Sequence, residues 1–206
     1  MIGIVDYKAG NLTSVKRALD YIGIPSVVSA DPSALAACER IIFPGVGNAQ
    51  SAMAALKERG LDRAIRDAFN RGVPILGICL GAQIVLSHSE EGDTPCLGII
   101  EGACKTITVA DPLLKIPHMG WNEISVVRPH FMLKDIMPNS QVYFVHSYYP
   151  LPRDERMVFA TFDYGSVFPC AIGDKNLFAT QFHLEKSGPV GLAMLKNFAA
   201  WDGASC

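Results

Sequence analysis

A cysteine lies between two glycines near the middle of the 206-residue chain, in Gly77-Ile78-Cys79-Leu80-Gly81. This pattern is typical of a sharp turn from a strand into a helix, where Cβ atoms beside a nucleophile have no room. A cysteine at the start of a helix also lies at the positive end of the helix dipole, which favours a reactive thiolate. A buried structural cysteine fits these five residues equally well, so other residues must decide.

A histidine and a glutamate near the C-terminus supply the two groups that a thiolate nucleophile needs, a proton carrier and an acid that orients it. They are His183 and Glu185, within Gln181-Phe182-His183-Leu184-Glu185-Lys186. In an extended segment, residues two apart point the same way, roughly 6.6 Å apart along the chain. A lone histidine in such a segment is more often a satisfied surface or core residue. The pairing with Glu185, together with Cys79, favours catalysis.

A glycine-rich turn supplies a candidate oxyanion hole. Phe43-Pro44-Gly45-Val46-Gly47 follows an apolar run, so backbone N–H groups of Val46 and Gly47 can face a carbonyl under attack, alongside the N–H of Leu80. Ligands of open parallel sheets bind beyond the carboxyl ends of the strands, where this turn is expected. An ordinary connection between a strand and a helix remains an alternative explanation for the glycines.

The elements that must position these residues alternate between strand and helix. We predict strands at 1–7, 26–29, 40–43 and 73–78, and helices at 12–22, 49–59 and 61–71. This alternation indicates a mostly parallel sheet covered on both faces. After Glu91, short β-like runs predict a more antiparallel second half, and a strand at 177–182 and a helix at 190–201 return to the first pattern. Neither a repeat nor a linker is evident, so we predict one domain over 1–206.

Composition excludes several classes of function. The chain has 18 Lys and Arg against 20 Asp and Glu, a formal charge of −2, which argues against nucleic-acid binding and a polybasic membrane anchor. The N-terminal apolar run is too short for a signal peptide, and the longest apolar stretch, 72–86, falls short of the roughly 20 residues of a spanning helix. We therefore expect a cytoplasmic protein with reduced thiols. Its six cysteines show no paired metal-binding spacing, so no metal or cofactor is expected.

Three motifs together resemble the class I, or triad, glutamine amidotransferases: PGVG at 44–47, GICLGAQ at 77–83 and QFHLEKS at 181–187. The resemblance implies an α/β fold of three layers. It also implies that Cys79 attacks the side-chain amide of glutamine, giving a glutamyl thioester and ammonia. His183 would protonate the leaving amine and later activate water, while Glu185 orients His183. The family usually has proline where this chain has Leu184, so we expect a looser geometry between the last two residues.

Further segments resemble one branch of that family, the glutaminase subunits of imidazole glycerol phosphate synthases. They are Gly10-Asn11, PHMGWN at 117–122 and YFVHSYY at 143–149, and the match covers essentially the whole chain. The resemblance implies a heterodimer with a (β/α)8-barrel cyclase subunit, which uses the ammonia to make imidazole glycerol phosphate in histidine biosynthesis.

The same resemblance assigns binding residues one position at a time. Gln83 and Glu91 match residues that hold the amino and carboxylate ends of L-glutamine, and Gln83 lies one helical turn after Cys79. From the residues alone, a tryptophan is more often core and a lysine more often a solvated charge. The positions expected at or near the cyclase interface are Asn11, His118, Trp121, Asn122, Tyr143 and Lys186.

Alternative functions remain open on the sequence alone. The ammonia could serve another acceptor, such as a pyridoxal phosphate synthase. A cysteine hydrolase of the α/β-hydrolase type is disfavoured by chain order, since its acid precedes the histidine whereas Glu185 follows His183. A docking subunit with an inactive triad is a third interpretation. The intact triad residues speak against it, whereas Leu184 keeps it open.

Overall fold

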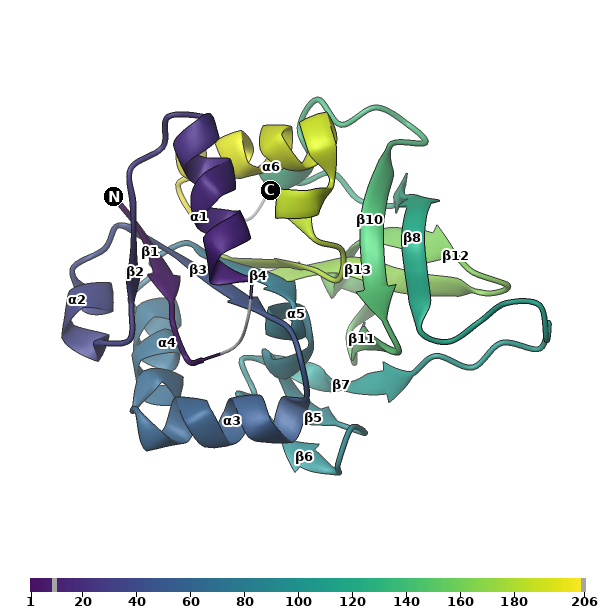
Figure 1. Ribbon diagram of the computed structural model, residues 1–206, viewed down its shortest axis with the longest axis horizontal. Helices are drawn as coiled ribbons and strands as arrows, with labels where there is room; N and C mark the ends of the chain where they lie inside the picture. Colours follow the sequence, from purple (N-terminus) through teal and green to yellow (C-terminus); the bar gives the residue numbers. More distant parts are fainter. Residues whose placement is uncertain (9–10, 205–206) are drawn as a thin grey trace.

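An eight-stranded mixed sheet forms the centre of the computed structural model, which describes residues 1–8 and 11–204 (Figure 1). The order of its strands is β2-β1-β3-β4-β14-β13-β12-β9. Gly10 of the predicted first turn, and Cys206, lie outside the described residues. The first half of the chain contains β1 (Ile2–Val5), α1 (Leu12–Tyr21), β2 (Ser26–Ser29), α2 (Pro32–Ala36), β3 (Arg40–Gly45), α3 (Ala49–Glu58), α4 (Leu61–Asn70), β4 (Ile75–Cys79) and α5 (Leu80–Ile84).

The first five strands of that order pair in parallel, which confirms the sheet predicted from the alternation of strands and helices. β1 and β4 are buried along their whole length, because helices cover both faces of a parallel sheet. The predicted helices end within a residue or so of the observed ones. The short helix α2 was not predicted; the Asp31 side chain caps it by accepting a hydrogen bond from the Ser33 N–H.

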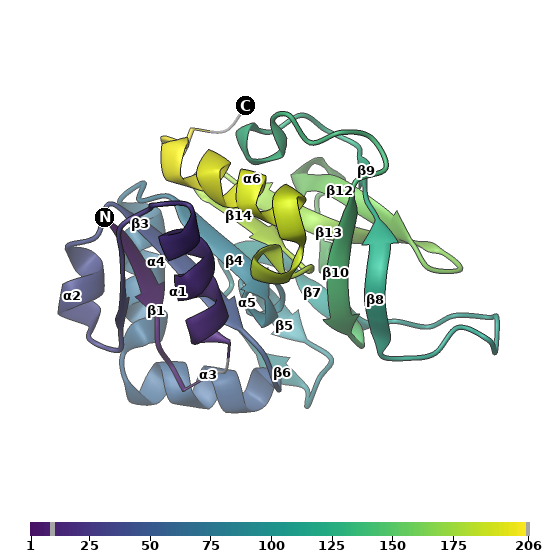
Figure 2. The same ribbon diagram turned by 45° about the horizontal axis from the view of Figure 1, so that its top comes forward.

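Helices cover both faces of the sheet, which gives the predicted three layers. A separate hydrophobic core lies between the sheet and the helices on each face. Figure 2 shows α1 and α6 side by side over one face, where residues such as Val15 and Phe198 are buried. Helices α3, α4 and α5 cover the other face with residues such as Leu56 and Ile65. The strands of the sheet contribute alternate residues to each core, so the sheet is fixed from both sides.

The second half of the chain is mostly antiparallel, as predicted. β13 pairs antiparallel with β14 and β12, which extends the main sheet, and two smaller sheets, β10-β8 and β11-β7-β5-β6, stand beside it. Its elements are β5 (Leu86–Ser89), β6 (Thr94–Pro95), β7 (Ile100–Thr106), β8 (His118–Glu123), β9 (Ser125–Val126), η1 (Phe131–Leu133), β10 (Gln141–His146), β11 (Tyr148–Pro152), η2 (Glu155–Met157), β12 (Val158–Asp163), β13 (Val167–Asp174), β14 (Leu177–Thr180), η3 (Leu184–Lys186) and α6 (Gly188–Ala200).

Three adjacent parallel strands, β3, β4 and β14, bring the candidate residues to one edge of the sheet. Gly45 at the end of β3 is in register with Cys79 at the end of β4, and Thr180 at the end of β14 pairs with Ile78. The segments that follow these strands therefore meet at the carboxyl edge, where open sheets bind ligands. Among the described residues, no helix is long and apolar enough to cross a bilayer.

Candidate active site

The backbone at Cys79 has the strained geometry predicted for a nucleophile at a strand-to-helix turn. Its φ is 54° and its ψ is −106°, values that a residue with a side chain rarely adopts. Neither neighbouring glycine has space for a larger side chain. A Cβ at Gly81 would lie 2.0 Å from the carbonyl oxygen of Phe43, and one at Gly77 would lie 2.9 Å from the Cβ of Ala179. The two glycines therefore let the turn pass between β3 and β14.

The predicted pair of His183 and Glu185 is formed and fully enclosed. The imidazole Nδ1 lies 2.7 Å from Oε1 of Glu185, and the two side chains are 1% and 0% exposed. The prediction of an extended segment was wrong, because Glu185 lies in the single turn of 3₁₀ helix η3 that follows His183. Leu184 is buried in the core between them, and the hydrogen bond closes without the family's usual proline.

Further hydrogen bonds fix this pair from both sides. The His183 N–H donates to the carbonyl of Tyr143 at 2.9 Å, and the Ser187 hydroxyl donates to the His183 carbonyl at 2.6 Å. The side-chain amide of Asn11 donates to Oε1 of Glu185. Asn11, predicted near the partner interface, thus also contacts the candidate catalytic acid.

The electrostatics of His183 favour its charged form. Burial lowers the pKa of the imidazole, but hydrogen bonding and charge attraction from Cys79 and Glu185 outweigh it and raise that pKa well above its ordinary range. Glu185 holds Nδ1 of His183, so Nε2 is the nitrogen left to interact with Cys79 and with a reacting group. A histidine held this way can take the proton of a thiol and give it to a leaving group.

Burial makes the other described cysteines poor nucleophiles. It raises the pKa of the Cys38, Cys104 and Cys170 thiols, and raises that of Cys96 to about 11. Each therefore stays a neutral thiol near pH 7, and the thiolate is the attacking species in cysteine chemistry. Of the five described cysteines, only Cys79 lines a pocket beside the strand-to-helix turn.

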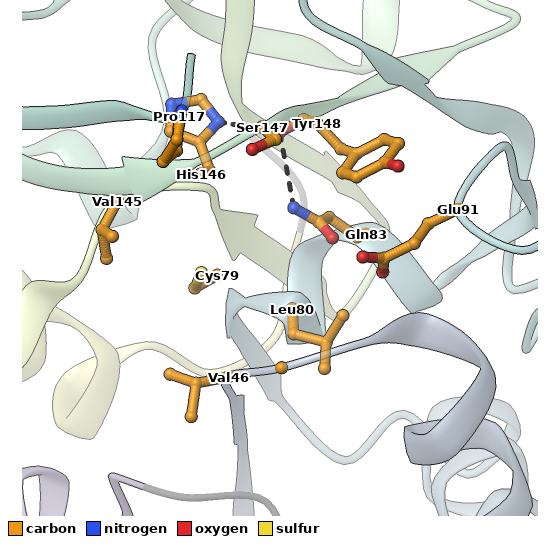
Figure 3. A pocket seen from close by; sticks show the side chains of 11 residues that line it. Val46, Cys79, Leu80, Gln83, Glu91, Pro117, Val145, His146, Ser147 and Tyr148 are labelled. Atoms are coloured by element: carbon orange, nitrogen blue, oxygen red, sulfur yellow. Dashed lines mark hydrogen bonds between the residues drawn. The ribbon is translucent and has the colours of Figure 1, made fainter. Parts of the chain in front are cut away.

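A pocket of about 270 Å³ opens beside Cys79 (Figure 3). The candidate oxyanion residues Val46, Gly47 and Leu80 form one wall, as the sequence predicts for a turn at the end of β3. The remaining lining residues come from α5, from Glu91, from the residue before β8, and from the segment around β10 and β11. They are Gln83, Glu91, Pro117, Val145, His146, Ser147 and Tyr148.

Gln83 and Glu91 both line this pocket, and their acceptor atoms lie on neighbouring parts of its wall (Figure 3). The Gln83 amide nitrogen donates to Oε1 of Gln181 at 3.0 Å and to the Tyr148 carbonyl at 3.4 Å. Its oxygen consequently turns toward the Glu91 carboxylate, as Figure 3 shows. Oε2 of Glu91 accepts a hydrogen bond of 2.7 Å from the Ala49 N–H at the start of α3.

Gln181 is a site residue that the sequence reasoning missed. It is fully buried, and its amide nitrogen lies 3.6 Å from the sulfur of Cys79 while its oxygen accepts from Gln83. It therefore joins the two predicted residues directly. Its position at the start of the motif at 181–187 could have indicated a role. A glutamine at the end of a strand, however, has no chemistry of its own that predicts one.

Trp121, Tyr143 and Lys186 form one exposed cluster, here called the aromatic face. Trp121 is 54% exposed, its ring meets that of Tyr143 edge-on at 6.0 Å, and the Lys186 ammonium lies 5.6 Å from the Tyr143 ring centre. Strands β8 and β10 pair these two rings directly across from each other. The alternative that Trp121 is a core residue is thus wrong.

Two other predicted interface residues lie outside the aromatic face. His118 is 4% exposed and packs among the rings of Phe144, Phe162 and Tyr164, because its position in β8 points inward. Its placement at the interface is corrected: the side chain is in the core. Asn122 is half-buried and donates to the Asp163 carbonyl at 2.8 Å.

The described residues contain no group of three or more His, Cys, Asp or Glu side chains that could hold a metal ion. The groups that the structure brings to the pocket are a cysteine, a histidine and carboxylate pair, and candidate N–H donors. That set suits attack on an amide or ester carbonyl.

Residues 4–201 match the family described as glutamine amidotransferase class-I. The chain belongs to this family. It is 51% identical over 207 residues to the imidazole glycerol phosphate synthase subunit HisH of Nitratidesulfovibrio vulgaris strain Miyazaki F, which covers 98% of this chain and 97% of that one. The subunit of the same name from Moorella thermoacetica is 46% identical over 96% of this chain and 93% of that one. Within the class, this chain belongs with the HisH subunits.

Solved structures share the fold at much lower identity. The PurLQS structure from Thermotoga maritima has a TM-score of 0.75 at 20% identity and covers 97% of both chains. The glutaminase domain of Trypanosoma brucei CTPS has a TM-score of 0.65 at 15% identity over 97% of this chain and 93% of that one. These likenesses establish the class I amidotransferase fold.

Proposed function

We propose that this chain is the glutaminase subunit of imidazole glycerol phosphate synthase, which hydrolyses L-glutamine and passes the ammonia to a cyclase subunit in histidine biosynthesis. The observation that carries the proposal is the closed pair of His183 and Glu185 beside a strained Cys79 at a pocket. The high identity to HisH subunits supports the choice of pathway.

Glutamine binds with its ammonium group between two acceptors, the Gln83 oxygen and the Glu91 carboxylate (Figure 3). The family resemblance divided these residues between the two ends of the substrate, but a carboxylate repels a carboxylate, so both suit the ammonium end. The side chain of the substrate then extends toward Cys79. Its amide carbon meets the sulfur at the strand-to-helix turn.

Attack by the Cys79 sulfur turns the amide carbonyl into an oxyanion, which faces the N–H of Leu80 and the Val46-Gly47 turn. The His183 imidazolium, which holds the thiol proton on Nε2, gives it to the departing nitrogen, so ammonia leaves and a thioester remains. His183 next takes a proton from water as the water attacks the thioester. Glutamate departs, and the proton returns to the Cys79 sulfur.

The cyclase docks on the aromatic face and receives the ammonia there. Trp121 and Tyr143 lie on β8 and β10. The other ends of these two strands reach the pocket lining at Pro117, Val145 and His146. Ammonia released into water near neutral pH becomes ammonium and loses its nucleophilicity, and a partner seated over this region prevents that loss. The cytoplasm, where thiols stay reduced, is the compartment we propose.

The test replaces His183 with Ala in the complex with the cyclase subunit and follows imidazole glycerol phosphate formation from either nitrogen source. We expect glutamine-dependent synthesis to fall at least about 10³-fold, while ammonium chloride supports the parent rate, because His183 acts only on glutamine. Failure of ammonium to rescue a folded complex would give His183 another role. Undiminished glutamine use by a folded complex would show that glutamine hydrolysis does not pass through His183.

A further inference from the structure

Two buried histidines that the triad does not use face each other across the two-stranded sheet. His118 on β8 is in register with His146 on β10, and the two are 4% and 5% exposed. Nδ1 of His118 lies 3.1 Å from Nε2 of His146. Only one proton fits between two ring nitrogens at this distance, so one ring donates and the other accepts.

The neighbouring acceptors decide which ring donates. Nδ1 of His146 lies 2.7 Å from the Tyr148 carbonyl oxygen, which only accepts, so this nitrogen carries a proton. Burial lowers the pKa of His118 to about 4 and that of His146 to about 3, so both rings are neutral near pH 7. Nε2 of His146 is then bare and accepts from Nδ1–H of His118. Nε2 of His118 is bare in turn, and the Asn122 amide nitrogen lies 3.5 Å from it.

This directed chain of hydrogen bonds ends at the substrate pocket. The Tyr148 carbonyl that accepts from His146 also accepts from the Gln83 amide nitrogen, and Gln181 is the second acceptor of that nitrogen. Two acceptors on the nitrogen leave the Gln83 oxygen to face the pocket beside Glu91 (Figure 3). A flipped Gln83 amide, with its nitrogen and oxygen interchanged, would instead point an N–H at the substrate ammonium. Two donors facing each other repel.

We propose that His118 and His146 are positioning residues for glutamine, which hold the Tyr148 carbonyl and through it the orientation of the Gln83 amide. The inference rests on the proposed function. It also ties the pocket to the strands that carry Trp121 and Tyr143, since β8 and β10 contain both the histidine pair and these two rings of the aromatic face.

Kinetics of the complex test the positioning role through His118, which does not line the pocket. His118→Phe keeps a ring but removes the donor to His146. We expect the KM for glutamine to rise roughly three- to tenfold, the effect of one net hydrogen bond, with kcat little changed. His118→Asn returns an N–H near the position of Nδ1 and should restore most of the affinity. An unchanged KM in a folded His118→Phe complex would overturn the proposal.

A third buried histidine provides the matched control. His130 packs against Phe159, Phe178 and Trp201 in the core away from the pocket, and burial lowers its pKa to about 4 as well. His130→Phe should leave the KM for glutamine unchanged. If His130→Phe and His118→Phe raise KM equally, the effect is general loosening of the core and the positioning role is wrong.

Nitrogen NMR of the isolated chain tests the geometry without any need for activity or for folding of a variant. At pH 7, ¹⁵N-labelled His118 and His146 should both be neutral and both carry the proton on Nδ1. An Nε2–H form or an imidazolium at either residue would contradict the chain of hydrogen bonds. A parent complex that binds cyclase but never hydrolyses glutamine would refute the proposed function while leaving this tautomer result intact.

Discussion

The turn around Cys79 and the aromatic face around Trp121 position their functional side chains in different ways. At the turn, an unusual backbone positions the side chain: Cys79 has a positive φ, and Gly77 and Gly81 have no room for a Cβ. On the aromatic face, plain antiparallel strands carry large exposed side chains. Substitution of either glycine should therefore affect folding and catalysis together, whereas changes on the face should affect association alone.

The largest expected effect comes from the nucleophile itself. Cys79→Ser keeps the turn and replaces the sulfur by a hydroxyl oxygen, a much weaker nucleophile in this chemistry, so glutamine-dependent turnover should fall by at least about 10³-fold. Cyclase binding and ammonium-dependent synthesis should stay at parent levels, measured by titration and product assay. Residual turnover near the parent value would show that catalysis does not pass through this sulfur.

The next effect is on folding. Gly81→Ala would force a methyl group against the Phe43 carbonyl, so we expect the free energy of unfolding to fall by about 3 kcal/mol or more. Gly98→Ala is the control: its φ is positive, at 65°, but nothing lies within 4 Å of the added Cβ, so a loss of about 1–2 kcal/mol is expected. Equal losses in urea denaturation would contradict the account of a crowded turn.

The two tryptophans separate association from folding. Trp121→Ala should weaken cyclase binding by about 2 kcal/mol, roughly 30-fold, with the Tm of the isolated chain almost unchanged. Trp201 is 1% exposed, and Trp201→Ala should cost the fold roughly 3–5 kcal/mol. Calorimetry of the chain and of the complex checks both. If the Trp121→Ala chain melts far below the parent, Trp121 supports the fold and its role is not confined to association.

The smallest effect concerns a buried group with no chemical role. The depressed pKa of His130 means that its contribution to stability is fully present above its unfolded pKa near 6.5 and is lost as pH falls through about 4. Nδ1 of His130 accepts from the Met132 N–H, and His130→Asn keeps an acceptor there. Between pH 7 and pH 5, this variant should lose about 1–2 kcal/mol less unfolding free energy than the parent. If urea titrations give the variant and the parent the same pH dependence, the lowered pKa of His130 does not contribute to the pH dependence of stability.

The sequence predicted the parallel half of the fold well, because apolar periodicity and glycine punctuation report directly on buried strands and covering helices. It also predicted the strand-to-helix turn at Cys79, since Gly77 and Gly81 are required by close backbone contacts. The 3₁₀ turn at Glu185 escaped prediction, because local spacing alone favours an extended segment at the end of β14.

The sequence also could not show which face of the two-stranded sheet β10-β8 is buried. Trp121 and His118 are three residues apart on one strand, so an alternating pattern places them on opposite faces. Nothing in the sequence says which face packs against Phe144 and Phe162, and pairing across β10 decides it. Gln181 was missed for a related reason, since its contacts come from residues about 100 positions away.

Labelling with a diazo-oxo-norleucine, an electrophilic analogue of glutamine, tests the central claim most directly. The pocket brings this reagent to one described cysteine, and burial keeps the other four described thiols protonated. Mass spectrometry of the cyclase complex should find one label per chain, on Cys79, with excess glutamine slowing its addition. A label on Cys38, Cys96, Cys104 or Cys170, or labelling that glutamine does not slow, would contradict the account.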